Sequence, residues 1–478
     1  MKVDTQHRDY TAYSPVWSKI RDVVEGQERV HAKGVKYLPK LPNQTSDEHK
    51  EYVDRTPFFN ATQRTVDALT GLVFRKDPKL EAGDKVKSYS EDITMTGKTL
   101  DSLAEDVVEE LLTVTRGGLL VEYPNVSNGE TVSIAQADKE NRRPYLTHYK
   151  AESIINWREG RVNGKMQYTL IVFRESVEIV SVDGFEVEIE DQYRVLDLDE
   201  DNHYRQRVFV KAEKGFSLKE EVYPLKGGKY FNEIPFFFVS LKQEGAGIVK
   251  PKCIDMVNMN ISHYHTTASL EHGAHFTALP TLVATGINLG DEESGNDNGD
   301  EIIVGSTQAI TTSEPDAKVY YVEFQGVGLS TLQEMQKSKE EKLAQMGARM
   351  LTPEKKTAES TDTVTIRQSG ENSILASIAQ CVSDVLTQAL NVMAEWEGVN
   401  GDIKYQITKD FIPKGMTPQM VSELIALVQG GHISQETLFN ELKQGEVITS
   451  PVDYEEEQGR IEEQGPDMSM IGREDDNE

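Results

Sequence analysis

The sequence predicts an α+β fold in which a β-rich region is followed by long helices. Between about residues 145 and 240, short apolar runs alternate with polar residues and turns, which is typical of antiparallel strands with one solvated face. Three later stretches, 252–276, 329–350 and 363–396, repeat apolar residues at intervals of three and four, as amphipathic helices do. Residues 277–326, between the first two helices, predict a small insert of short strands around a polar loop.

The chain before the β-rich region predicts an extended segment and two helices. Residues 1–50 are polar and punctuated by proline, and we expect them to wrap over another surface. Apolar residues at helical spacing predict helices over about 60–74 and 100–114. Gly117-Gly118 end the second helix, and residues 119–123 have the composition of a strand.

The end of the chain predicts a strand, two short helices and a tail. Residues 403–407 form the strand, and the two helices fall within 413–452. Thr417 caps the first of these helices and Ser434 starts the second. Residues 453–478 contain 11 acidic and 2 basic residues, a net charge of 2 − 11 = −9, and we expect this tail to be disordered.

The overall charge is strongly acidic. Lys and Arg total 51, Asp and Glu total 80, and the formal net charge is −29. Proteins that bind nucleic acid tightly usually present a basic face. This chain therefore either does not bind DNA or contacts it without binding it tightly. No run approaches the roughly 20 apolar residues of a membrane span, and the polar start lacks the apolar core of a secretory signal. Cys253 and Cys381 both lie in helical stretches and are expected to be reduced, which favours the cytoplasm.

Gly97-Lys98-Thr99 before a helix resembles part of a phosphate-binding loop. Such a loop needs an apolar strand and a glycine five residues before the second glycine. Here that position is Asp92, which would repel phosphate, and the preceding residues 87–91 are polar. We therefore interpret Thr99 as an ordinary helix cap.

Four histidines cluster in the stretch 252–276: His263, His265, His272 and His275. Three of them, His265, His272 and His275, share a helical face beside Glu271. They lack the His-Glu-x-x-His spacing of a zinc site. We expect packing or subunit contacts rather than metal binding. No nucleophile–base motif is present either, so we expect no cofactor, no metal and no catalytic activity.

The helix 329–350 carries an interrupted apolar stripe. Lys339 breaks a run of five apolar residues at heptad-like spacing, which are Leu332, Met335, Leu343, Met346 and Met350. A long helix with one apolar face needs a partner surface, and a symmetric oligomer can supply one. We predict that Leu332, Met335 and Met346 contribute to a helix seam or to subunit contacts.

A polar loop at 352–362 separates two of the long helices. It carries Lys355 and Lys356 beside Glu354 and Glu359. One interpretation is a solvated connection. The other is a mobile loop whose two lysines touch phosphate weakly.

The sequence resembles phage portal proteins and, within them, a portal-like group that was long an uncharacterised family. The resemblance is carried by four long segments: RTPFFNATQRTVDALTGLVFRKDP (55–78), RPYLTHYKAESIINWRE (143–159), NISHYHTTASLEHGAHFTALPTLVATG (260–286) and SGENSILASIAQ (369–380). It implies the portal fold, assembled as a dodecameric ring at one capsid vertex. It also implies that Lys355 and Lys356 lie in a tunnel loop facing DNA.

The resemblance further implies a division of the chain into named regions. In order, these are an N-terminal extended segment (1–50), a β-rich wing (51–250), a stem helix (251–276), a small α/β clip (277–326), a second stem helix (327–350), the tunnel loop (351–362), a long wing helix with a returning strand (363–412), a helical crown (413–452) and the acidic tail (453–478).

The partners implied by the resemblance are those of a head–tail connector. They are further copies of the chain, the terminase large subunit, the major capsid and scaffolding proteins, a head-completion or tail adaptor, and duplex DNA held weakly and without sequence preference. Such a protein is assembled in the bacterial cytoplasm, resides in the virion and contacts no membrane. The acidic charge fits a conduit, because each lysine–phosphate contact adds affinity. Two alternatives stay open: another oligomeric capsid or adaptor protein, and a nucleotide-dependent packaging enzyme.

Overall fold

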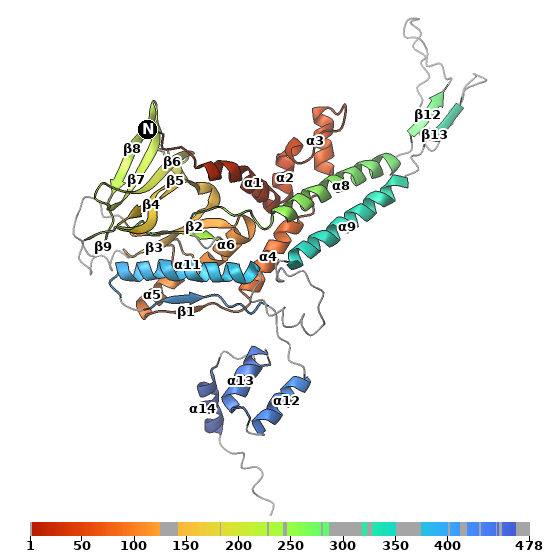
Figure 1. Ribbon diagram of the computed structural model, residues 1–478. Helices are drawn as coiled ribbons and strands as arrows, with labels where there is room; N and C mark the ends of the chain where they lie inside the picture. Colours follow the sequence, from red (N-terminus) through yellow and green to blue (C-terminus); the bar gives the residue numbers. More distant parts are fainter. Residues whose placement is uncertain are drawn as a thin grey trace, which may run out of the picture. The chain divides into compact units, whose positions relative to one another are not determined.

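The computed structural model describes most of the chain as two units. Unit 1 comprises Met1–Thr357 and Glu371–Thr408, and unit 2 comprises Ala358–Gly370 and Lys409–Glu478. The described residues are 2–124, 142–181, 183–226, 229–241, 246–278, 281–285, 318–322, 327–349, 374–399, 402–411, 418–429, 432–445, 447–448 and 452–464. The fold is mixed α+β, as predicted (Figure 1).

The N-terminal residues are helical, so the prediction of an extended segment over 1–50 is wrong. Three helices fill this region: α1 (Arg8–Glu25), α2 (Gln27–Ala32) and α3 (Ser46–Arg55). The buried residues of α1 are the apolar Tyr10, Trp17, Ile20 and Val23, together with Asp22. Pro15 lies inside α1 without ending it. Thr45 and Glu48 form a capping box at the start of α3, a sequence signal that could have identified this helix.

The two helices predicted next are confirmed. They are α4 (Ala61–Val73) and α6 (Leu100–Thr113), and between them lie β1 (Lys79–Glu81) and α5 (Asp84–Tyr89). Thr99 caps α6, because its hydroxyl accepts a hydrogen bond from the Ser102 backbone amide at 3.2 Å. The sheet region contains two main sheets with the orders β11-β2-β3 and β4-β5-β6-β7-β8.

All pairings within these two sheets are antiparallel. The strands are β2 (Arg116–Glu122), β3 (Tyr145–Lys150), β4 (Ile154–Val162), β5 (Lys165–Val180), β6 (Val187–Leu198), β7 (Tyr204–Ala212), β8 (Gly215–Val222) and β11 (Phe236–Ser240), and β9 (Leu225–Lys226) pairs with β10 (Lys229–Tyr230). Within the β-rich region predicted over about 145–240, the strands are longer than the short apolar runs indicated. β5 is one continuous strand that turns at Asp183-Gly184 into β6, with Gly184 at φ +79°.

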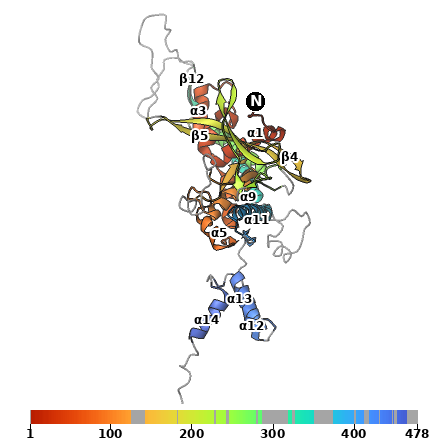
Figure 2. The ribbon, with the colours of Figure 1, turned by 90° about the vertical axis from the view of Figure 1, so that its left-hand side faces the viewer.

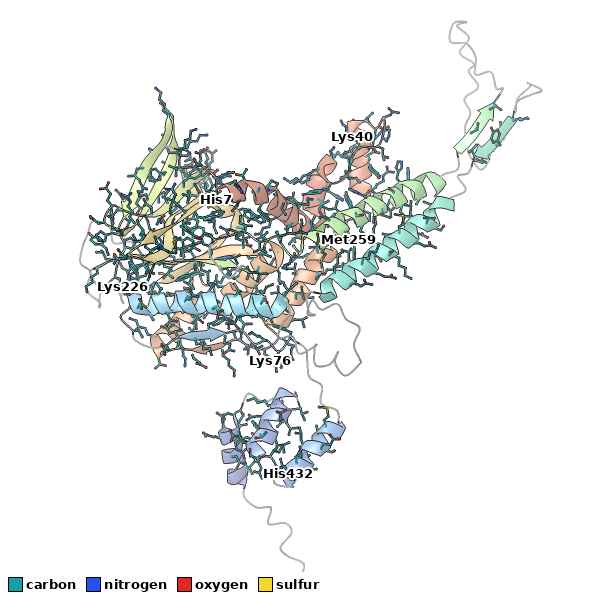
Figure 3. All side chains as sticks on the ribbon, viewed as in Figure 1. His7, Lys40, Lys76, Lys226, Met259 and His432 are labelled. Atoms are coloured by element: carbon teal, nitrogen blue, oxygen red, sulfur yellow. The ribbon has the colours of Figure 1, made fainter. Side chains whose placement is uncertain are left out.

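Aromatic side chains fill the space between the two sheets. Tyr149 stacks on Phe173 with ring centroids 3.9 Å apart, and Phe236 lies 5.2 Å from Phe173. A Cβ at Gly118 would lie 2.0 Å from the Phe236 ring, so only glycine fits under this side chain. Figure 3 shows how densely side chains occupy this part of unit 1.

A buried ion-pair network joins α1 to α6. The Glu110 carboxylate is 3% exposed and lies 2.6 Å from the Arg21 guanidinium, which also bonds Glu152 at 2.9 Å. The Ala151 amide donates to Glu110 at 3.0 Å. Burial by itself would lower the pKa of Arg21, but the two carboxylates raise it. Each charge in the network is therefore stabilised by its partners.

Helix α11 (Ile374–Trp396) and strand β14 (Lys404–Gln406) complete unit 1 (Figure 1). β14 pairs antiparallel with β1, which confirms the predicted strand. The buried face of α11 is broader than the predicted stripe, since it also includes Leu375, Val382, Leu386, Leu390 and Met393. Residues 363–373 of the predicted helix lie outside the described residues.

Unit 2 contains α12 (Pro418–Gln429), α13 (Gln435–Gln444) and α14 (Tyr454–Gln464). The first two confirm the predicted helices, and Ser434 caps α13. The prediction that the whole tail is disordered is corrected over 454–464. Asp453 accepts from the Glu456 amide at 2.9 Å at the start of α14, and Tyr454 packs on Phe439 with ring centroids 5.7 Å apart. Residues 465–478 lie outside the described residues.

Candidate functional site: the α8–α9 pair and the β12–β13 sheet

Two long helices lie side by side in unit 1 and run in opposite directions (Figure 1). They are α8 (Ile254–Ala278) and α9 (Val327–Arg349), which confirm the helices predicted at 252–276 and 329–350. Between them in sequence, β12 (Thr281–Thr285) pairs antiparallel with β13 (Lys318–Val322). We call the two helices the α8–α9 pair. Within the described parts of the chain, none of the helices is long and apolar enough to span a membrane.

The base of the pair is fixed by one buried amide. Asn260 is fully buried on α8, and its oxygen accepts from both the amide and the hydroxyl of Thr62 at 3.1 Å. Its nitrogen donates to the Phe59 carbonyl at 2.9 Å. Because Thr62 is in the first turn of α4, Asn260 satisfies backbone groups that a helix start leaves unpaired.

The contact between the two helices is mostly polar. Lys339 donates to the Ser262 carbonyl at 2.8 Å and to the Thr266 hydroxyl at 2.5 Å. The amide of Gln336 donates to the Thr267 hydroxyl at 3.2 Å. Burial, helped by nearby Lys342, lowers the pKa of Lys339. The residue that interrupts the predicted apolar stripe is therefore itself part of the contact.

Two features bring the helices close together. A Cβ at Gly273 would lie 2.7 Å from a methyl carbon of Leu329, so glycine permits the approach there. Leu343 is 2% exposed and is the apolar residue of α9 that is buried. Leu332 and Met346 are half-buried, whereas Met335 is 46% exposed. Of the predicted apolar stripe, Leu343 is therefore buried by the chain itself, whereas Met335 lies on the surface.

The β12–β13 sheet exposes apolar side chains. All five residues of β13 are exposed, including Tyr320 at 48% and Tyr321 at 57%. A two-stranded sheet is marginally stable in water by itself. Among the described residues no third strand pairs with β12 or β13, so this region presents both a strand edge and an apolar surface.

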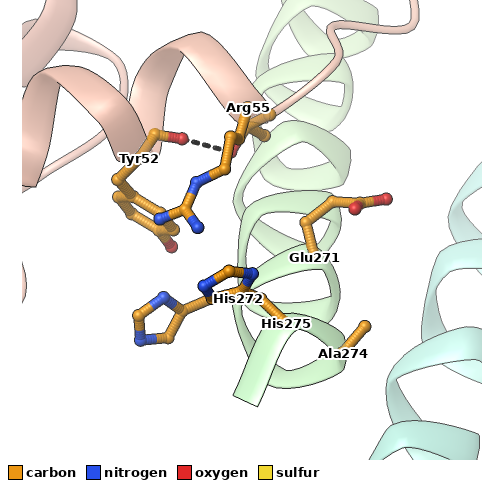
Figure 4. A pocket seen from close by; sticks show the side chains of 7 residues that line it. Tyr52, Arg55, Glu271, His272, Ala274 and His275 are labelled. Carbon is orange, nitrogen blue, oxygen red and sulfur yellow. Dashed lines mark hydrogen bonds between the residues drawn. The ribbon is translucent and has the colours of Figure 1, made fainter. Parts of the chain in front are cut away.

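The histidines predicted at a helix seam lie against the N-terminal helices. His265 bonds the Tyr37 carbonyl at 2.6 Å, and His272 packs edge-on against Tyr52 with ring centroids 5.3 Å apart. His275 lines a cavity of about 330 Å³ with His272 and Arg55 (Figure 4). Partial burial, then Arg55 and His275, lower the pKa of His272.

A different histidine reaches α9. His263 is 1% exposed, and its Nε2 lies 3.1 Å from the Glu340 carboxylate. His265 and His272 thus make packing contacts with the N-terminal region, while the contact of His265, His272 and His275 with another subunit stays a prediction. Among the described residues, no group of three or more His, Cys, Asp or Glu side chains could hold a metal ion.

In the loop that resembles a phosphate-binding loop, carboxylates of the chain itself bond the groups that would bind phosphate. The Gly97 amide donates to Asp92 at 2.7 Å, and the Lys98 ammonium pairs with Asp106. Lys355 and Lys356, the predicted DNA-facing residues, lie outside the described residues. Sequence reasoning missed Asn260, Gln336 and Glu340. The repeat of polar residues at spacings of three and four along α8 was the available signal for such a polar contact.

Three comparisons relate the chain to known proteins. Residues 253–397, which span α8 to α11, match a family model described as a domain of unknown function (DUF4055). No curated protein matches the sequence.

Among solved structures, the chain is similar to one from the virion of a native gene transfer agent (GTA) particle, with 11% identity, a TM-score of 0.39, and coverage of 87% of this chain and 97% of that one. It is also similar to a chain from the neck of an empty GTA particle computed with C6 symmetry, with 12% identity, a TM-score of 0.38, and coverage of 87% and 97%. A third, from the neck of a native GTA particle computed with C12 symmetry, has 11% identity, a TM-score of 0.40, and coverage of 84% and 93%.

Proposed function

We propose that the chain forms the portal ring of a tailed phage or phage-like particle, the channel through which DNA enters and leaves the capsid. The observation that carries this proposal is the α8–α9 pair with its β12–β13 sheet. Tyr320, Tyr321 and Met335 expose apolar surface there that no described part of the chain covers. Neighbouring copies around a closed ring would cover such surfaces repeatedly. The resemblance of four long sequence segments to portal proteins supports the same assignment.

The charge of the chain supports a channel that does not hold DNA. A net charge of −29 repels phosphate at long range. Few lysine–phosphate contacts also mean little counterion release and low affinity. Lys355 and Lys356 remain the residues that we propose to face DNA. In a virion, such a ring would dock the terminase large subunit during packaging and head-completion or tail proteins afterwards.

We also propose that the chain is not an enzyme. Asp92 accepts from the Gly97 amide, so a carboxylate lies where a phosphate-binding loop would offer that donor. Lys98 is paired with Asp106, which removes the cation that such a loop needs. If a fluorescent ATP analogue bound the wild-type protein and not Lys98→Ala, the nucleotide-dependent alternative would replace this proposal.

Electron micrographs of the purified full-length protein test the ring. We expect rings with a central channel, and sedimentation of one species much heavier than the 53.7 kDa chain. A protein that stays monomeric at the highest soluble concentration, or that forms closed shells or filaments, would contradict the proposal. Tight binding of duplex DNA by the ring at physiological salt would contradict the low-affinity channel.

A further inference from the structure

The longest strand of the five-stranded sheet has opposite charges at its two ends. β5 contains 16 residues, Lys165–Val180, which corresponds to a length of roughly 50 Å. Its first residue pairs with Val162 across the turn to β4, and its last residue pairs with Val187 across the turn to β6. The two turns are therefore held at opposite ends of one strand. Figure 2 shows the sheet lying across unit 1, with the labels β5 and β4 on opposite sides.

The end that leads into β6 is an acidic, apolar ribbon. β7 pairs with β6 only from Gln192 onward, so residues 177–181 and 183–190 extend past the rest of the sheet as two strands. These residues, which we call the acidic ribbon, include five acidic residues and no basic one: Glu178, Asp183, Glu186, Glu188 and Glu190.

Apolar side chains on the acidic ribbon are exposed. Phe185 at the turn is 89% exposed and Ile189 is 69% exposed, and Ile179, Val180 and Val187 are 45%, 56% and 52% exposed. Acidic residues lie opposite apolar ones in the paired strands; for example, Glu188 pairs with Ile179. A free two-stranded ribbon with this composition is poorly stabilised by its own contacts. It has the character of a surface that becomes buried against a partner.

The end that leads into β4 is basic. Residues 158–166, which we call the basic turn, contain Arg158, Arg161 and Lys165 against Glu159 alone, a net charge of 3 − 1 = +2. Arg158 and Arg161 form no ion pair with any described residue, and Lys165 is 3.9 Å from Glu233 with both side chains largely exposed. Met166, next to them, is 63% exposed. The basic turn therefore has the opposite charge to the acidic ribbon and exposes one large apolar side chain, Met166.

We propose that the acidic ribbon of one copy docks on the basic turn of the next copy. The two ends of β5 cannot meet within one chain, because the strand itself separates them by its full length. Two copies placed head to tail bring them together, and this kind of interface generates a closed ring when the rotation between copies closes. The inference rests on the proposed ring and identifies a surface that would set its direction. Complementary charges would also speed the encounter of copies and exclude the reverse orientation.

Charge reversal at either end tests the contact in the full-length protein. The ribbon variant carries Glu186→Lys, Glu188→Lys and Glu190→Lys, and the turn variant carries Arg158→Glu and Arg161→Glu. Each variant alone places like charges at every contact between copies, so we expect each to lose the ring species in sedimentation and in micrographs. The matched control is Lys50→Glu with Lys87→Glu, which reverses two exposed charges on α3 and α5, outside the sheet. It should assemble like wild type.

Mixing the two variants separates a specific contact from simple damage. A ribbon variant next to a turn variant restores opposite charges at every contact, so an equimolar mixture should regain rings in which the two variants alternate. One chain carrying all five substitutions should also assemble by itself. Circular dichroism and thermal unfolding like those of wild type show that each single variant is folded.

The outcomes also distinguish this contact from the ring itself. If wild type forms rings and both variants alone do so equally well, the contact is wrong and the ring proposal stands. If the variants fail alone and the mixture stays unassembled, the charge complementarity is wrong. If wild type forms no ring and the mixed variants do not associate at low ionic strength, both proposals fall.

Discussion

The β-rich body of unit 1 and the α8–α9 pair differ in how much of their surface the chain covers by itself. In the body, Tyr149, Phe173 and Phe236 pack between two sheets, and the buried carboxylate of Glu110 pairs with Arg21 of the same chain. Along the pair, the helix contact is polar, and β13 is exposed along its whole length. The body is stabilised by contacts within one chain, whereas the pair and its sheet keep exposed apolar side chains that no described residue covers. Substitutions in the two regions should therefore divide into effects on folding and effects on assembly.

The largest expected effect is in the body. Glu110→Ala removes the buried one of the two carboxylates that pair with Arg21 and leaves the Ala151 amide without an acceptor. Breaking a buried pair in this way costs about 3–5 kcal/mol, measurable as a lower midpoint of urea unfolding. Glu109→Ala changes the exposed neighbouring residue on the same helix and should shift stability by less than about 0.5 kcal/mol. Equal effects of the two substitutions would show that the network contributes little.

The next largest effect is at the base of the pair. Asn260→Ala leaves the buried amide and hydroxyl of Thr62 without an acceptor, whereas the Phe59 carbonyl still accepts from the Ala61 amide. The expected cost is roughly 2–3 kcal/mol. Asn258→Ala removes only an exposed hydrogen bond to Lys19 and is the matched control. Hydrogen exchange should show faster opening of α8 and α4 in Asn260→Ala. Unchanged exchange there would mean that Asn260 does not anchor the pair.

A pH effect of about 3 kcal/mol is expected in the body. Burial lowers the pKa of His148 to about 4, against the opposing effect of Asp106. The folded state therefore binds its proton less readily than the unfolded state, whose histidine titrates near 6.5. Stability from this group is fully present above pH 6.5 and is lost as the pH falls toward 4. His148→Gln should flatten the slope of unfolding free energy against pH over that window; an unchanged slope would exclude His148 as its source.

A smaller effect is expected along the helix contact. Lys339→Met removes the hydrogen bonds to Ser262 and Thr266 but keeps the length of the side chain. Because the contact is partly exposed, we expect a loss of about 0.5–1 kcal/mol. Lys337→Met on the exposed face of α9 is the control. A loss above about 3 kcal/mol in thermal unfolding would mean that this polar contact is as important as a buried pair.

The smallest effect on folding should accompany the clearest effect on assembly. Tyr321→Ser removes an exposed ring from β13 and should change the stability of the monomer by less than about 0.5 kcal/mol. If β13 lies between copies, the ring species in sedimentation should decrease strongly. Val35→Ser, at a residue with similar exposure, should leave assembly intact. Rings formed equally well by both variants would remove β13 from the interface.

Local patterns predicted the elements where one signal dominated. Helices α4, α6, α8 and α9 follow from apolar spacing, and Thr99 follows from its position before α6. The N-terminal helices were missed because Pro15 and a polar composition outweighed the buried face of α1. Helix α14 was missed because its acidic residues conceal the few apolar ones, including Tyr454, that pack on α13. The candidate site was located as two helices around an insert, but not the side chains that join them.

The sequence by itself determined the α+β class, the two long helices with the strands between them, and the acidic charge. These properties depend on periodicity and composition, which are local. Only the tertiary structure decided that Asn260 anchors α8, that Lys339 belongs to the helix contact, and that β5 separates a basic turn from an acidic ribbon. These facts depend on pairs of residues far apart in the chain, such as Asn260 with Thr62. No local pattern specifies such pairs, because the packing of one element on another selects them.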